Sequence, residues 1–259
     1  MQRVSIITIS FNQAKFLERN RISVRGQGPG VEHIIVDPGS TDGSRELIAG
    51  WAVEAEVVPI LERDRGPADG LNRGVQASTG DIWMYLNADD ELAPGAIAEV
   101  RRAHASVDDE VVIGNGWTID ETGAPIRRVV SDKFTPMRYA MSVGTVLQQG
   151  TSFKAAGTRG VVAFNEANRF NWDTEYLFDL YRRGCRFAYI DADLGYFRLQ
   201  GESITMSGSF EKNLRAERLR LRSTVPGYRL LQLISPVARA MKRAKGSNST
   251  RRFPGLVVS

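Results

Sequence analysis

Residues 4–12, VSIITISFN, form the stretch that decides the class of the fold. Its first six residues are mostly β-branched and almost continuously apolar, which predicts a strand buried on both faces of a parallel sheet. Similar patterns recur at HIIVD (33–37), VVPI (57–60) and IWMYL (82–86). The intervening segments around 13–24, 44–51 and 67–77 suit helices. Strands and helices that alternate over short connections predict an α/β fold with a right-handed, mostly parallel sheet.

Polar and acidic residues stand where each of these four strands ends. Ser10 and Asn12 follow the first strand, Asp37 the second, residues 62–64 the third and residues 87–90 the fourth. In open α/β sheets, ligands bind outside the carboxyl ends of the parallel strands. The sequence therefore predicts a binding site at this edge of the sheet.

Charge is divided unevenly along the 259 residues, which carry a net charge of +4. Residues 211–259 hold twelve Lys and Arg against two acids, a net charge of +10, whereas residues 1–210 carry −6. An acidic body lacks the basic surface that nucleic-acid binding requires, so we expect no nucleic-acid partner. A single cysteine excludes an intramolecular disulfide, and one cysteine with two histidines argues against a Cys- or His-based metal site.

After residue 94 the sequence predicts a less regular arrangement. The expected elements are a helix over 94–105, a strand over 111–116, a hairpin around 121–123, a loop-rich stretch over 134–160, a helix over 171–184 and a strand over 186–190. The basic C-terminal part is helical over 211–222 and amphipathic over 228–245.

Four motifs, in this order, resemble family 2 glycosyltransferases of the GT-A fold. They are VSIITISFN (4–12), HIIVDPGSTDGS (33–44), DGLNRG (69–74), and TGD (79–81) with the strand that leads to NADD (87–90). The second half agrees more weakly, through residues 149–153 and the helix that carries Asp173. The resemblance implies one Rossmann-like GT-A domain with a nucleotide-sugar-binding half (1–92), an acceptor-binding half (93–207) and a basic helical tail (208–259).

The activity that this resemblance implies is an inverting glycosyl transfer of the hexosyltransferase type, as in polysaccharide biosynthesis. The sugar moves from a nucleotide-diphospho-sugar, with UDP favoured over GDP or dTDP, to a hydroxyl of a glycan or a lipid-linked acceptor. Asp37 is implied to contact the base, and its carboxylate can accept the N–H groups of uracil or of guanine. Arg65 and Arg73 could contact phosphate. The implied nucleotide contacts are Thr8, Ser10, Asn12, Asp37, Ser40, Asp69, Asn72, Asn87, Ala88 and Asp89.

Two of these motifs also have purely structural interpretations. Residues 39–43 are typical of a turn and helix cap. Asp69 and Asn72 lie three residues apart on one helical face, which could instead face solvent.

A divalent cation, Mn²⁺ or Mg²⁺, is implied because it neutralises the diphosphate that leaves. The resemblance places it at residues 87–90, with Asp89 and Asp90 as its ligands. Asn87 stands where many relatives have Asp, so the motif has one carboxylate fewer. The alternative is that the two aspartates cap the helix that follows.

Inverting transfer needs a base that removes the proton of the acceptor hydroxyl. The resemblance places this base at the start of the 171–184 helix, where Asp173 is the better match and Glu175 the second. A helix-capping role is the alternative for Asp173. Residues 196–203 resemble the closing-loop segment that follows the last strand in this family. Arg198 within it is expected to hold the departing diphosphate, unless it is an exposed loop residue. Gln149 and Trp172 are implied to line the acceptor cleft, although a core position suits Trp172 equally.

Departures from the family pattern keep two other functions open. Asn87, Pro38 and Gln200 replace residues that are usual in relatives, and Gln200 stands where some relatives have a metal-binding His. They favour a catalytically degenerate homologue that binds glycans or nucleotides, but the retained aspartates argue against it. A nucleotidyltransferase on a related sheet would need a Gly-rich, basic first loop, which residues 10–13 do not offer.

The basic tail suggests contact with a membrane surface. Residues 228–243 are amphipathic and cationic, as in helices that lie on anionic lipid, although Pro236 interrupts the pattern. The alternative is a helix that packs on the acidic body. No apolar run reaches the ~20 residues of a membrane span, and no signal-peptide pattern is present. We therefore expect a cytoplasmic location, which would be peripheral at the inner face of the membrane if the tail binds lipid.

Overall fold

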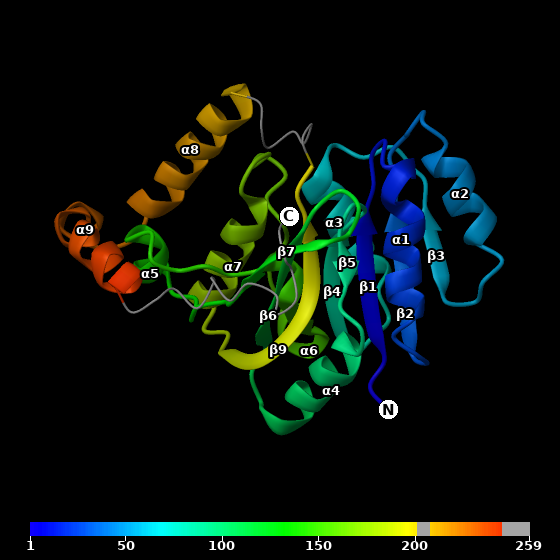
Figure 1. Cartoon of the computed structure of the whole chain (residues 1–259), viewed down its shortest axis with the longest axis horizontal. Coiled ribbons are helices and arrows are strands. Elements are labelled where there is room, and N and C mark those ends of the chain that lie inside the picture. The colour runs from blue at the N-terminus through cyan, green and yellow to red at the C-terminus, as the bar shows by residue number, and fades with distance from the viewer. Residues whose placement is uncertain (201–207, 245–259) are drawn as a thin grey trace, which may run out of the picture.

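A curled mixed sheet runs through the centre of the protein, with helices on both sides (Figure 1). The computed structural model describes residues 1–200 and 208–244. Its elements are β1 (Val4–Ile9), α1 (Ala14–Arg25), β2 (Val31–Val36), α2 (Ser44–Trp51), β3 (Val57–Ile60), α3 (Pro67–Ala77), β4 (Ile82–Asn87), β5 (Glu91–Leu92), α4 (Ala96–Ser106), β6 (Val111–Ile119), β7 (Pro125–Val129), α5 (Pro136–Ala140), the 3₁₀ turn η1 (Gln148–Gly150), β8 (Thr151–Lys154), α6 (Ala155–Thr158), α7 (Trp172–Arg182), β9 (Phe187–Arg198), α8 (Gly208–Ser223) and α9 (Tyr228–Ala244).

The strand order is β3-β2-β1-β4-β8-β6-β9-β5, and β7 pairs with β6 at the side. β3, β2, β1 and β4 are all parallel, which confirms the predicted α/β arrangement of the first half. β8 is antiparallel to both β4 and β6, and it joins the two halves into one sheet. β1 lies between β2 and β4, and its Val4, Ile6 and Ile7 are fully buried, as its apolar sequence predicts.

β9 is longer than the sequence predicts. The expected strand ended at residue 190, and residues 196–203 were expected to form a closing loop, but β9 continues to Arg198. It pairs with β6 as far as Ile119–Arg198, with register shifts around Asn115. Residues 201–203 of the expected loop lie outside the described residues. Pairing with a distant strand therefore extends β9 where its own polar composition indicates a loop.

An aromatic cluster fixes the second half of the chain onto β4. Trp83 is fully buried and stacks on Phe153 with ring centroids 4.2 Å apart, and Phe164 stacks on Tyr176 at the same distance. Tyr85 packs edge-on against Phe164. Offset and edge-to-face contacts of this kind add stability beyond the burial of area. They position α7 and the loop before it beside the carboxyl end of β4.

The two C-terminal helices lie beside α5, far from the β1–β3 edge of the sheet (Figure 1). Pro236 does not end α9, because the Ser235 hydroxyl donates to the carbonyl of Gln232, the group that a residue 236 N–H would otherwise reach. Among the described residues, no helix is both long enough and apolar enough to cross a bilayer.

Close packing of α3 on β1 explains a glycine of the DGLNRG motif. A Cβ at Gly74 would lie 2.3 Å from Cγ2 of Ile7. Ile7 is fully buried under the helix and has no free space into which to move. Gly74 therefore lets the helix approach the central strand closely.

Replacing Gly74 by alanine should destabilise the protein, because the added methyl group overlaps Ile7. We expect a loss of about 1–3 kcal/mol in the free energy of unfolding, measured by urea denaturation. Gly50→Ala is the matched control, because Gly50 is exposed in α2 and nothing lies within 4 Å of its Cβ position. The control should gain up to about 1 kcal/mol, and equal effects of both substitutions would contradict the packing argument.

Candidate active site

A cavity of about 910 Å³ lies at the carboxyl ends of β1, β2 and β4, where the sequence predicts a binding site. The residues that line it come from the loops after these strands, from the loop before α3 and from the loop before α7. They are Ile9, Ser10, Phe11, Gln13, Val36, Pro38, Gly39, Arg63, Asp64, Arg65, Gly66, Pro67, Asn87, Ala88, Asp89 and Arg169. We refer to this space as the strand-end cavity.

Ser10 faces the strand-end cavity with an unused polar group. The residue is only 2% exposed, and its hydroxyl has no hydrogen-bond partner among the described residues. Buried polar groups are nearly always paired in folded proteins. The Ser10 hydroxyl is therefore suited to bind a polar atom of a ligand, and its contact with a nucleotide stays a prediction.

Asp37, Ser40 and Asn12 build the wall of this cavity through bonds to one another. The fully buried Asp37 carboxylate accepts hydrogen bonds from the backbone N–H groups of Gly39 and Ser40 and from the Ser40 hydroxyl. The Ser40 hydroxyl accepts the N–H of Asn12, which ties the loop after β1 to the loop after β2. The cavity surface itself is formed by Pro38 and Gly39, so the contact of Asp37 with a base stays a prediction.

Thr8 does not reach the strand-end cavity, which corrects the expected nucleotide contact. Its hydroxyl lies in the interior, 2.8 Å from Nε2 of His33 and 3.3 Å from Oδ1 of Asn20. Burial lowers the pKa of His33 to about 3 and that of His104 to about 4, so both rings are neutral internal groups at neutral pH.

The α3 motif positions other groups instead of facing the cavity. Asp69 accepts hydrogen bonds from Arg65 and Arg73, which lower the pKa of Asp69 to about 2. Asn72 donates to the carbonyl of Phe164 and accepts its N–H. Neither Asp69 nor Asn72 lines the cavity, but Asp69 holds Arg65 at the rim, and Asn72 fixes the loop that contains Arg169.

The two aspartates at the end of β4 have different environments. Asp89 lies on the cavity surface, where its Oδ2 accepts a hydrogen bond of 2.6 Å from the Gln200 amide. Asp90 is fully buried and accepts the N–H of Arg198 and the side-chain amides of Gln149 and Asn87. Burial raises the pKa of both carboxyls.

These contacts correct two of the expected roles. Asp90 is expected to bind a metal, but it is fully buried and both of its oxygens accept internal hydrogen bonds. Gln149 is expected to line the acceptor cleft, but it is buried and holds Asp90.

The donor set fits a cation that arrives with a nucleotide better than one bound by the protein alone. Within residues 1–200 and 208–244, no three His, Cys, Asp or Glu side chains gather into a metal site. Asp89 is the carboxylate of the NADD motif on the cavity surface, with Asn87 and Ala88 beside it. Mg²⁺ at nucleotide sites uses one or two protein carboxylates and completes its shell with phosphate oxygens and water. Asp89 fits this pattern as a ligand.

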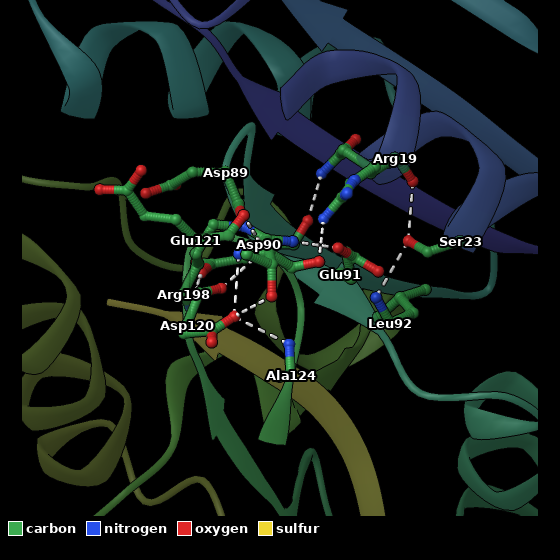
Figure 2. A network of polar contacts seen from close by, with 12 residues as sticks. Arg19, Ser23, Asp89, Asp90, Glu91, Leu92, Asp120, Glu121, Ala124 and Arg198 are labelled. Atoms are coloured by element: carbon green, nitrogen blue, oxygen red, sulfur yellow. Dashed lines mark hydrogen bonds and ion pairs between the residues drawn. The ribbon is translucent and has the colours of Figure 1, made fainter. Parts of the chain in front are cut away.

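Arg198 is a buried structural cation, and the expectation that it holds a diphosphate is wrong. Figure 2 shows it between the 89–92 segment and the turn at residues 120–121. Its guanidinium donates to the carbonyls of Asp89, Asp120 and Glu121 and pairs with the Glu91 carboxylate. The side chain is fully buried. Such a group has no free face for a phosphate.

Asp173 lines a second cavity of about 420 Å³ at the start of α7. Burial raises the pKa of the Asp173 carboxyl, which strengthens it as a proton acceptor once it is ionised. Glu175 instead accepts hydrogen bonds from Asn165, Asn168 and Arg220, which removes it as the alternative base. Trp172 belongs to the aromatic core, with its ring centroid 5.7 Å from that of Tyr85, and lines neither cavity.

Several residues that line the cavity received no individual role from the sequence, among them three charged groups. Arg63 and Asp64 follow the end of β3, where the strand-end rule predicts the site, but no motif marked them as ligands. Arg169 carries no such signal. Its guanidinium lies over Gly66, where an added Cβ would be 2.3 Å from Nη1, and only folding brings these residues together.

The sequence pattern of the group described as "Glycosyl transferase family 2" matches residues 5–163, more than half of the chain. The protein belongs to glycosyl transferase family 2. An uncharacterised glycosyltransferase of Nostoc sp. is 24% identical over 227 residues, which cover 80% of this glycosyltransferase and 68% of the relative. The putative teichuronic acid biosynthesis glycosyltransferase TuaG of Bacillus subtilis is 34% identical over 91 residues, covering 34% of this chain and 36% of TuaG.

Solved structures of GT-A glycosyltransferases share this fold at low sequence identity. Staphylococcus aureus TarS in complex with UDP superimposes with a TM-score of 0.64 at 15% identity, over 85% of this chain and 64% of the TarS chain. The mannosyltransferase PcManGT of Pyrobaculum calidifontis, in complex with GDP-Man and Mn²⁺, gives a TM-score of 0.62 at 16% identity, over 98% and 77%. The expected GT-A fold is thereby confirmed.

Substitutions at Asp89 and Asp90 should have opposite effects on ligand binding and stability. Asp90→Asn places an amide against three internal donors, so the free energy of unfolding should fall by about 1–3 kcal/mol. Asp89→Asn should keep stability within about 1 kcal/mol but weaken Mn²⁺-dependent UDP binding about tenfold. Urea denaturation and calorimetric titration measure the two effects. A stable Asp90→Asn variant that loses only the metal effect would reverse the assignment.

Proposed function

We propose that this glycosyltransferase moves a sugar from a nucleoside-diphosphate sugar to a hydroxyl of a glycan or a lipid-linked acceptor, with inversion. The observation that carries the proposal is a pair of neighbouring cavities. The strand-end cavity presents Ser10 and Asp89, and the second cavity presents Asp173. Arg169 lines the first and Phe170 the second, so one step of the chain separates them.

The strand-end cavity suits a nucleotide-sugar in size and charge. Its volume of about 910 Å³ lies in the range of small-molecule sites. Arg63, Arg65 and Arg169 on its rim carry the positive charge that a diphosphate needs. UDP is the favoured carrier, since TarS was solved with UDP and with UDP-GlcNAc, while GDP-Man in the mannosyltransferase keeps GDP as the main competitor.

In the proposed reaction, the acceptor oxygen forms a bond to the anomeric carbon while the bond from that carbon to the diphosphate breaks. Asp173 takes the proton of the acceptor hydroxyl, and the nucleoside diphosphate leaves with the electron pair. The rim arginines stabilise the charge that develops on it. A divalent cation held by Asp89 would add Lewis-acid neutralisation of the diphosphate.

A panel of UDP, GDP and dTDP, each with and without Mn²⁺, tests the donor assignment by thermal shift. We expect UDP with Mn²⁺ to raise the melting temperature most. Asp173→Asn should lower turnover of the matching UDP-sugar about 10²–10⁴-fold and leave UDP affinity unchanged, because the base acts on the acceptor. No response to any nucleotide would sink the donor proposal, and a fall in both turnover and UDP affinity would place the base elsewhere.

An anionic membrane surface at the cytoplasmic face is the partner that we propose for α9. Leu230, Leu233, Ile234, Val237 and Met241 recur at helical spacing and are all at least half exposed, Leu233 to 74%.

The neighbouring face of α9 packs on the body through Tyr228, Leu231 and the buried Ser235. Arg229 and Arg239 lie exposed beside the apolar stripe. This arrangement is typical of a helix lying in a lipid interface.

Co-sedimentation with phosphatidylglycerol-containing vesicles tests this membrane contact. The double substitution Leu230→Asp, Leu233→Asp should weaken vesicle binding at least about tenfold, because each leucine that becomes buried in the lipid contributes roughly 1.5–3 kcal/mol to binding. Val53→Asp is the control, since Val53 is 89% exposed in the loop after α2. Unchanged vesicle binding of the double variant would contradict the proposal. So would a variant that binds vesicles normally but no longer self-associates, because the stripe would then be a contact between copies of the protein.

A further inference from the structure

We propose that the cavity beside Asp173 binds a phosphate group of the acceptor, so that the enzyme glycosylates a phosphate-bearing molecule. This inference rests on the proposed transfer reaction and specifies its acceptor. It is carried by the side chains that surround Asp173, most of which belong to elements that the donor does not need.

The cavity lies between α5, α7 and α8, with Phe197 of β9 on its wall. Three cations line it together with one carboxylate. Lys133 lies in the loop before α5, Arg138 in α5, Arg218 in α8, and Asp173 in the first turn of α7. The described residues thus give this space an excess of positive charge, although the surrounding body of the protein is acidic.

Two of the cations are not fixed in place by a hydrogen bond or an ion pair among the described residues. Lys133 and Arg218 are exposed, and neither makes a hydrogen bond or a salt bridge within the described residues. Arg138 pairs with Asp132, yet its Nε is buried without a hydrogen-bond partner. Asp132 also forms an ion pair with Lys242 of α9, so its single negative charge is shared between two cations.

Neutralising Asp173 does not account for these cations. Arg218 alone is sufficient to balance that carboxylate, with which it interacts electrostatically. Lys133 and the Nε of Arg138 then remain without a partner among the described residues. A neutral acceptor would leave Lys133 without a counterion and the Nε of Arg138 without a hydrogen-bond acceptor, whereas a phosphate offers oxygens and negative charge to both.

The position of the cavity favours the acceptor over the donor as the phosphate's source. Lys133, Arg138 and Arg218 do not line the strand-end cavity, which has its own three arginines. Asp173 lies among the first group, so a hydroxyl that reaches this base carries its phosphate into contact with them. The adjacent residues Arg169 and Phe170 keep the two anion sites separate but neighbouring.

Binding of glycerol 3-phosphate to the full chain tests the inference, with glycerol as the neutral probe. Ligand-detected NMR in the presence of UDP and Mn²⁺ should show binding of the phosphate and not of glycerol. Arg218→Gln and Lys133→Gln should each weaken this binding about five- to tenfold. Arg215→Gln is the matched control, because Arg215 lies exposed on the same helix outside the cavity and should change nothing.

The affinity for UDP, measured on the same variants, separates the outcomes. Unchanged UDP affinity with weakened glycerol 3-phosphate binding supports an acceptor phosphate. Weaker UDP binding in Arg218→Gln would assign the cations to the donor and overturn the inference. Equal binding of glycerol and glycerol 3-phosphate would overturn it as well. If the unaltered protein does not bind UDP but still binds glycerol 3-phosphate, the proposed donor is refuted and the phosphate site is supported.

Two sources of the phosphate differ in what surrounds it. Farnesyl diphosphate represents a lipid-linked acceptor, and glycerol 3-phosphate represents a phosphate within a glycan or polyol chain. Tighter binding of farnesyl diphosphate that Arg218→Gln weakens would identify a lipid-linked source. If glycerol 3-phosphate binds more tightly than farnesyl diphosphate, the phosphate belongs to a glycan or polyol chain. Failure of both probes to bind would contradict the inference.

Discussion

The candidate site depends on one buried cation, the guanidinium of Arg198. The guanidinium donates to the backbone carbonyls of Asp89, Asp120 and Glu121, and the backbone N–H of the same residue donates to the Asp90 carboxylate (Figure 2). The end of β4, the end of β9 and the β6–β7 turn are thereby joined at one point. Removing a charge from water costs several kcal/mol unless it is fully paired, so Arg198 is tolerated only because these partners surround it. The position of Asp89 at the cavity is a consequence of this network.

Around this network, most polar residues of the family motifs build the site and only a few face it. Asp37 closes its own turn, Asp69 holds two arginines, and Asp90 is saturated by amides. The oxygens of each carboxylate accept hydrogen bonds from neighbouring residues, and these bonds make the wall of the site rigid. Rigidity of this kind places the few unpaired groups, such as the Ser10 hydroxyl, at fixed positions where a ligand can meet them.

The opposite charges of body and tail have a structural role as well. Arg220 of α8 pairs with Glu175 at the start of α7, and Lys242 of α9 contacts Asp132 beside α5. These pairs hold the basic helices against the second half of the domain, next to the cavity of Asp173. Lys242, Tyr228 and Leu231 contact the body, while the apolar stripe of α9 stays exposed.

Local pattern in the sequence determined the strands and helices of the first half, the edge of the sheet that carries the site, and the family. These features follow from periodicity and from residues near one another in the chain, such as Ser10 after β1 and Asp89 after β4. Only the tertiary structure decided which side chains are free to act. Asp89 and Asp90 are neighbours with the same chemistry, but Asp90 meets the N–H of Arg198, a residue 108 positions away. Arg169 reaches Gly66, and β9 extends along β6, for the same reason. Whether a polar group is hydrogen-bonded inside the protein or free to bind a ligand depends on residues from distant segments. A local sequence pattern does not contain that information.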